Sequence, residues 1–275
     1  MEVTGNGHGF HCVLEGPEGA PCVVLSHGLA TDLAMWDPLV PHLVSHYRVL
    51  RYDARGHGRT QTTAGDYTLE QLGGDAIAIV DALGLERPHF VGLSMGGMVG
   101  MGLALDHPGR FASVTVCDAR GEAPQQYRDS WTERSRKVRE SGIEAMVEPS
   151  VTRWFTERFQ RDEPGKIAWM RDMIRRTTAD GYCGCASALR RLDYERRLGS
   201  ITIPMLFLVG EADKGAPPDV MRGMHEKTPG SRFAAIAGAG HISAVEQPAA
   251  FAKALLGFLS EVERCNAGTA HRAAD

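Results

Sequence analysis

The stretch that decides the fold reads HFVGLSMGG, from His89 to Gly97. Its apolar residues 89–93 suit a buried strand and residues 95–106 suit a helix, so Ser94 stands at a sharp turn between them. Glycines at such a turn remove side chains that would clash, and the turn lifts the serine hydroxyl above the sheet. Gly-x-Ser-x-Gly also occurs by chance in glycine-rich turns. The strand before it and the helix after it favour a nucleophilic serine here.

Similar short apolar runs lie on both sides of this stretch. They cover residues 22–26, 48–52, 113–117, 204–209 and 232–236. Runs of this length and composition suit buried strands of a parallel sheet. Apolar residues at three- and four-residue spacing predict an amphipathic helix from Leu69 to Leu83, with Gly84 as its stop. Strands that alternate with helices predict an α/β fold with a mostly parallel, doubly wound sheet.

The strand pattern is interrupted once. Residues 120–199 are rich in Arg, Glu and Trp and contain no convincing strand, so they are predicted to form a helical cap inserted over the active site. The core is predicted from residues 1–119 and 200–265, closed by an amphipathic helix over about 248–262. The small and polar residues 266–275 are predicted to be a disordered tail.

A serine hydroxyl is a weak nucleophile unless a base takes its proton. Where a serine stands at this kind of turn, an acid and then a histidine follow it along the chain. His241 lies late in the chain, after a strand signal and before a helix, and is the predicted general base. Asp213 follows the run 204–209 and is the predicted acid that orients the imidazole. Glu211 and Asp118 are the rival acids.

Two backbone amides are needed to stabilise the oxyanion that serine attack creates. The amide of Met95, the first residue after the serine, is one candidate because the first amides of a helix point toward an anion at its N-terminus. The amide of Leu29, in the loop after the run 22–26, is the other. The nearby His27 is given no catalytic role, and the turn at residues 51–58 is interpreted as scaffold.

The composition excludes several function classes. The 275 residues carry a formal net charge of −4, which disfavours nucleic acid as a partner. No apolar run approaches the roughly 18 residues of a membrane helix, and residues 1–5 resemble no secretory signal, so a cytoplasmic protein without membrane contact is predicted. The six scattered cysteines are interpreted as reduced thiols. No cluster has metal-ligand spacing, and no metal is predicted.

Together these motifs resemble the α/β-hydrolase superfamily over about residues 20–259, and they are similar in particular to the 3-oxoadipate enol-lactonases. The similar segments are RVLRYDARGHG (48–58), GLSMGG (92–97), RWFT (153–156), GYCGCA (181–186) and GHIS (240–243). Many esterases share the core segments, whereas those in the insertion are more particular. The chain departs from the family at His27 and at DARG (118–121), where the family tends to have a neutral, small stretch.

The resemblance implies a serine hydrolase of the α/β-hydrolase fold that opens an enol-lactone ring in the degradation of aromatic compounds. It implies a small-molecule ester or lactone substrate and no cofactor. Because the implied substrate carries a carboxylate, a basic group should face the pocket, and Arg120, Arg134 and Arg153 are candidates. Trp131 and Trp154 are the further predicted substrate-binding residues. No oligomeric state is predicted.

Other activities fit the same motifs. A carboxylesterase for another small ester is one alternative, and a cofactor-free perhydrolase, in which peroxide replaces water, is another. A ligand-binding receptor on this fold is the non-enzymatic alternative, against which the intact set of Ser94, Asp213 and His241 argues. Haloalkane dehalogenases and epoxide hydrolases are disfavoured, because their related forms have an aspartate where Ser94 stands.

Overall fold

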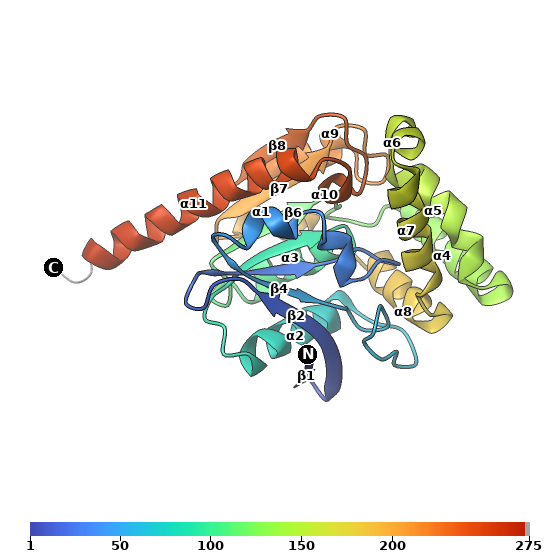
Figure 1. Cartoon of the computed structure of the whole chain (residues 1–275), viewed down its shortest axis with the longest axis horizontal. Coiled ribbons are helices and arrows are strands. Elements are labelled where there is room, and N and C mark those ends of the chain that lie inside the picture. Colours follow the sequence, from blue (N-terminus) through green and yellow to red (C-terminus); the bar gives the residue numbers. More distant parts are fainter. Residues whose placement is uncertain (273–275) are drawn as a thin grey trace.

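An eight-stranded sheet forms the centre of the protein in a computed structural model, which describes residues 1–272 (Figure 1). The strand order is β1-β2-β4-β3-β5-β6-β7-β8. The strands are β1 (Glu2–Gly5), β2 (His8–Glu15), β3 (Cys22–Ser26), β4 (Arg48–Tyr52), β5 (His89–Leu93), β6 (Ser113–Cys117), β7 (Met205–Gly210) and β8 (Arg232–Ile236).

The predicted parallel sheet is confirmed. Strands β4, β3, β5, β6, β7 and β8 pair in parallel, each at or within a residue of its predicted bounds. Strands β1 and β2 were not predicted. They pair antiparallel with each other, and β2 also pairs antiparallel with β4. Burial alternates along most of β2, which lies between β1 and β4, so this strand lacks the continuous apolar run that marked the parallel strands.

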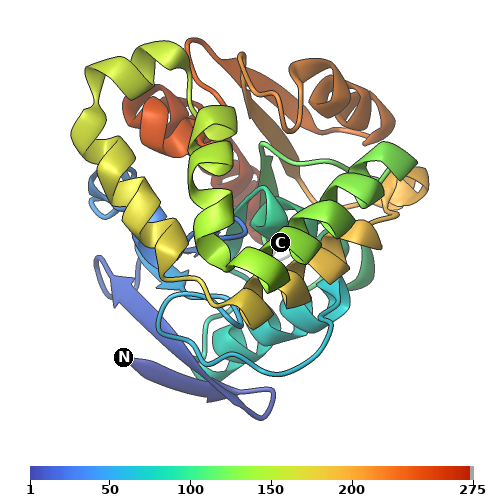
Figure 2. The same cartoon turned by 90° about the vertical axis from the view of Figure 1, so that its right-hand side faces the viewer.

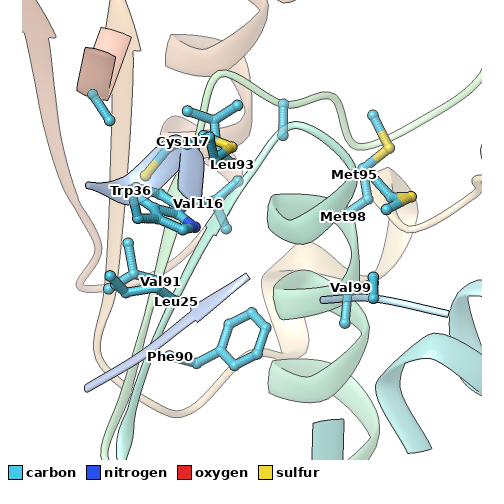
Figure 3. Close-up of a cluster of buried hydrophobic side chains, with 14 of the residues drawn as sticks. Leu25, Trp36, Phe90, Val91, Leu93, Met95, Met98, Val99, Val116 and Cys117 are labelled. Atoms are coloured by element: carbon cyan, nitrogen blue, oxygen red, sulfur yellow. The ribbon is translucent and has the colours of Figure 1, made fainter. Parts of the chain in front are cut away.

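Helices cover both faces of the sheet. They are α1 (Val40–Leu43), α2 (Leu69–Ala82), α3 (Met95–Asp106), α9 (Pro218–Lys227), α10 (Ser243–Glu246) and α11 (Pro248–Arg272), with the 3-10 helices η1 (Leu33–Trp36) and η3 (Glu195–Ser200). Met98 and Val99 of α3 lie on one side of the central strands and Trp36 on the other (Figure 3). The Trp36 ring packs 6.2 Å from that of Phe251 in α11. The core therefore lies in two layers, one on each side of the strands.

The insertion between β6 and β7 is helical, as predicted. It contains α4 (Gln125–Ser141), η2 (Ile143–Met146), α5 (Val147–Trp154), α6 (Glu157–Asp162), α7 (Pro164–Arg175) and α8 (Ala179–Arg190). These helices gather beside the body of the protein at one end of the sheet (Figures 1 and 2). An isolated antiparallel β-bridge pairs the backbones of Glu122 and Asp193 at the base of the insertion. The division of the chain at residues 119 and 200 stays a prediction.

The C-terminal helix is longer than predicted. Helix α11 continues to Arg272 and extends away from the body (Figure 1). The disordered tail expected from residue 266 stays a prediction. No proline interrupts residues 249–272, and the alanines in this stretch favour a helix. Residues 273–275 lie outside the described part of the chain. Within the described residues, no helix has the length and apolarity needed to cross a membrane.

Candidate active site

Ser94 lies at the turn between β5 and α3, in a backbone conformation that few residues adopt. Its φ is 54° and its ψ is −110°, and its amide donates to the carbonyl of Cys117 at 2.8 Å. The flanking glycines make this turn possible. A Cβ on Gly92 would lie 2.0 Å from the carbonyl oxygen of Gly96, and a Cβ on Gly96 would lie 2.3 Å from that of Ser26. The glycine spacing is therefore a steric requirement of the turn.

The structure brings the side chains of Ser94, His241 and Asp213 together. The Nε2 atom of His241 lies 3.0 Å from the Ser94 hydroxyl, and its Nδ1 lies 2.9 and 3.0 Å from the two carboxylate oxygens of Asp213. With the Nδ1 proton donated to the carboxylate, Nε2 can accept the proton of the hydroxyl. The amides of Gly215 and Ala216 donate to Oδ1 of Asp213 at 2.6 and 3.1 Å and hold the carboxylate in place.

Asp118, the rival acid, makes different contacts. It is fully buried at the end of β6, where the Gly210 amide donates to its Oδ1 at 2.8 Å and the Ser243 hydroxyl donates to its Oδ2. Burial, together with the nearby charge of Asp213, raises the pKa of Asp118 well above its ordinary value. A buried carboxyl that links β6 to later loops through Gly210 and Ser243, and that forms no hydrogen bond to His241 within the described residues, suits scaffold better than the orientation of the imidazole.

Two buried histidines fix the loop that contains Leu29. The amide of Ala54 donates to Nε2 of His27 at 2.9 Å, and the amide of Ala30 donates to Nε2 of His57 at 3.0 Å. His27 donates in turn from Nδ1 to the carbonyl of Gly28 at 2.8 Å. Both rings are therefore neutral, and they join this loop to the turn that the sequence analysis interpreted as scaffold.

Acid is expected to destabilise the protein through buried histidines. Burial lowers the pKa of His57 to about 3 and that of His89 to about 4, whereas a histidine in the unfolded chain has a pKa of about 6.5. The unfolded chain thus binds more protons below that pH, and the free energy of unfolding falls as the pH drops toward 4. Each histidine contributes about 1.4 kcal/mol per pH unit in this window.

Urea denaturation between about pH 7 and pH 4.5 measures this slope. The His89→Gln variant cannot titrate at this position, so its unfolding free energy should fall less steeply with acid than that of the wild type. An equal slope in both proteins would contradict the assignment of His89.

A cavity of about 310 Å³ opens above Ser94 and His241. All four predicted substrate-binding residues, Arg120, Trp131, Arg134 and Trp154, line it, as does Arg153. The predicted oxyanion-hole residue Leu29 also lines it, and Met95 supplies the first residue of α3 directly after Ser94. Sequence reasoning missed the lining residues Tyr127, Tyr182 and Lys214, because no local pattern shows which side chains of the insertion, or of the loop after β7, face the cavity.

The cavity is rich in positive charge. The Arg134 guanidinium lies 4.5 Å from the centre of the Trp131 ring, and that of Arg120 lies 5.3 Å from the centre of the Tyr127 ring. Burial and the nearby Arg134 lower the pKa of Arg153 to about 10. The guanidinium stays protonated at neutral pH, so the cavity suits an anionic ligand.

The insertion is hydrogen-bonded directly to the loop of His241. The His241 amide donates to the carbonyl of Trp154 at 2.7 Å. The buried carboxylate of Glu246 accepts the Gly240 amide at 2.8 Å and also the amide and hydroxyl of Thr156. The end of α5 therefore helps to set the position of the imidazole, a role for Glu246 and Thr156 that no local sequence signal indicated.

The described residues offer no evident metal centre. No group of three or more His, Cys, Asp and Glu side chains in this part of the chain could hold a metal ion.

Comparison with known proteins shows similarity to α/β hydrolases over most of the chain. The model of the family described as "alpha/beta hydrolase fold" matches residues 21–248. The "3-oxoadipate enol-lactonase 1" of Acinetobacter baylyi is 36% identical over 250 residues, which cover 91% of this chain and 92% of the relative. The crystal structure of the enol-lactonase from Burkholderia xenovorans LB400 superposes with a TM-score of 0.91 at 36% identity, covering 94% of this chain and 100% of the other. A candidate carbamate hydrolase, RutD, of Caulobacter sp. (strain K31) is 30% identical, over 91% of this chain and 95% of the relative.

Proposed function

Because this chain belongs to the α/β hydrolase fold family, we propose that it cleaves a small carboxylic ester or lactone through an acyl-enzyme on Ser94. The chain is similar to enol-lactonases over most of its length, which identifies it as an ester or lactone hydrolase. The acyl-enzyme is supported by one observation above all. The hydroxyl of Ser94, the imidazole of His241 and the carboxylate of Asp213 form a continuous hydrogen-bonded series beside the cavity.

The proposed reaction begins with attack of the Ser94 oxygen on the substrate carbonyl carbon while Nε2 of His241 takes the hydroxyl proton. The amides of Leu29 and Met95 stabilise the oxyanion of the tetrahedral intermediate. When the intermediate collapses, the bond from carbon to the ring or ester oxygen breaks, and His241 returns the proton to that oxygen. A water then attacks the acyl-enzyme with His241 again as base, which releases the acid and restores the serine.

The proposed substrate is 3-oxoadipate enol-lactone, an intermediate in the degradation of aromatic compounds. Two relatives named for this activity are 36% and 34% identical to the chain. The cavity supports the choice, since the substrate carries a carboxylate and the half-buried Arg134 over Trp131 offers it a cationic partner. The helices of residues 120–199 serve, in this proposal, as the cap that encloses the substrate.

Hydrolysis of 3-oxoadipate enol-lactone is expected to exceed that of 4-nitrophenyl butyrate, an ester without a carboxylate, by roughly tenfold or more in kcat/KM. Arg134→Met should raise KM for the lactone about tenfold and change the neutral ester little, because only the lactone loses a charged partner. Arg158→Met, on the exposed surface of α6, removes the same charge away from the cavity and is the control.

The same assay separates the alternatives. A carboxylesterase would favour the neutral ester, a carbamate hydrolase would favour a carbamate, and a perhydrolase would form peracid when peroxide is added. A receptor would bind these compounds without turnover. Any of these results in place of lactone hydrolysis would contradict the proposed substrate.

A further inference from the structure

The cavity contains more positive charge than one substrate carboxylate can balance. Arg120, Arg134, Arg153 and Lys214 line it, and Asp118 is the one carboxyl group among its lining residues. Both oxygens of Asp118 accept hydrogen bonds from Gly210 and Ser243, and within the described residues this carboxyl forms no ion pair with the arginines. Within the described side chains, none of the three arginines forms an ion pair with a carboxylate. Surface arginines of the same insertion do find such partners, as Arg171 does with Glu148.

The three arginines come from two separate places. Arg134 is on α4 and Arg153 on α5, both in the helical insertion, and they are close enough for the charge of Arg134 to lower the pKa of Arg153. Arg120 follows β6 and belongs to the end of the sheet. Its Nη1 donates to the carbonyl of Gly215 at 3.3 Å, in the same loop as Asp213.

The Arg120 side chain has hydrogen-bond donors without a partner within the described residues. Its guanidinium lies against the Tyr127 ring and makes one long hydrogen bond, whereas its Nε is buried and has no partner. A buried donor without a partner is costly, and such atoms in native proteins call for an explanation. The Nη2 of Arg120 also has no hydrogen bond within the described residues and is not buried, so an anionic ligand atom in the cavity would accept a charge-assisted bond from it.

We propose that the preferred substrate carries two carboxylates, one bound by Arg134 and Arg153 under the cap and the second bound by Arg120 beside the loop of Asp213. The inference rests on the proposed ester or lactone hydrolysis. It changes the preferred substrate from 3-oxoadipate enol-lactone, which carries one carboxylate, to an ester or lactone that carries two. The second anionic position lies directly after β6, in the segment 118–121.

Three 4-nitrophenyl esters with the same leaving group test the charge preference: those of butyrate, glutarate and tricarballylate, with no, one and two free carboxylates. For the wild-type enzyme, kcat/KM is expected to rise at each step, by roughly tenfold to a hundredfold per carboxylate. The free acids butyrate, glutarate and tricarballylate should inhibit hydrolysis of the neutral ester in the same order, a measurement that needs no variant.

Arg120→Met, which keeps an apolar side chain of similar length, locates the second position. It should lower kcat/KM for the tricarballylate ester by roughly tenfold or more and change the other two esters by less than about threefold. Arg134→Met should lower kcat/KM for both charged esters. Arg158→Met again controls for the loss of one positive charge.

Three results would overturn the inference. Equal rates for the glutarate and tricarballylate esters, together with equal inhibition by the two corresponding free acids, would show that no second anionic position exists. An equal loss on all three esters in Arg120→Met would mean that Arg120 only supports the loop of Asp213 through Gly215. Inhibition by the acid product without faster hydrolysis of the charged esters would mean that Arg120 binds the carboxylate that hydrolysis forms. If the neutral ester is still hydrolysed through Ser94, each of these three results rejects only the substrate with two carboxylates. The proposed ester or lactone hydrolysis then stands.

Discussion

Replacing Ser94 with alanine is expected to lower kcat/KM for every ester and lactone substrate by roughly a thousandfold to a millionfold. The hydroxyl that would form the acyl bond is gone, and the remaining amides and arginines can only bind the substrate. The fold should persist, because alanine keeps the backbone amide that donates to Cys117 and adds no atom to the crowded turn. Initial rates with a chromogenic ester, together with circular dichroism, measure both effects.

His241→Ala should cost about as much, and the double variant should lose little more than either single one, since residues that act as one unit are not additive. Ser141→Ala, at the exposed end of α4, is the matched control and should keep wild-type rates. A folded Ser94→Ala protein with near-wild-type turnover would refute the acyl-enzyme.

Replacing Asp213 with asparagine is expected to lower kcat by roughly a thousandfold to ten-thousandfold. The geometry gives the reason. The amides of Gly215 and Ala216 donate to Oδ1 of Asp213, so the asparagine oxygen would stay there and its NH2 would take the place of Oδ2. That NH2 would face Nδ1 of His241 and force the proton onto Nε2. In this tautomer Nε2 donates to Ser94 and cannot take its proton.

Asp118→Asn provides the contrast, with an expected loss of less than about tenfold. Asp118 forms no hydrogen bond to His241 within the described residues, and an asparagine can keep one hydrogen bond at each of its two oxygen positions. The oxygen accepts the amide of Gly210, and the NH2 donates to the hydroxyl of Ser243. Kinetics of the two variants side by side decide the matter: a large loss in Asp118→Asn with a small one in Asp213→Asn would move the acid to Asp118.

Short stretches of the sequence were enough to predict the parallel strands and the turn at Ser94, and to choose His241 and Asp213 as the predicted base and acid. Each depends on neighbouring residues: a short run of mostly apolar side chains, two glycines that steric contact demands, or a polar residue in the loop that follows a strand. The antiparallel strands β1 and β2 and the last turns of α11 gave weaker local signals. Their structure depends on pairing at the sheet edge and on uninterrupted helix propagation.

The sequence by itself therefore determined the parallel strands and the turn at Ser94, and it predicted that His241 and Asp213 would lie beside that serine, because these follow from local sterics and from strand order. Only the tertiary structure decided how the insertion completes the site. The bonds of Glu246 to Gly240 and Thr156 join segments up to 90 residues apart. Arg120, Arg134 and Arg153 come from separate elements and converge on one cavity. Such convergence depends on how helices pack, which the spacing of residues along the chain does not encode.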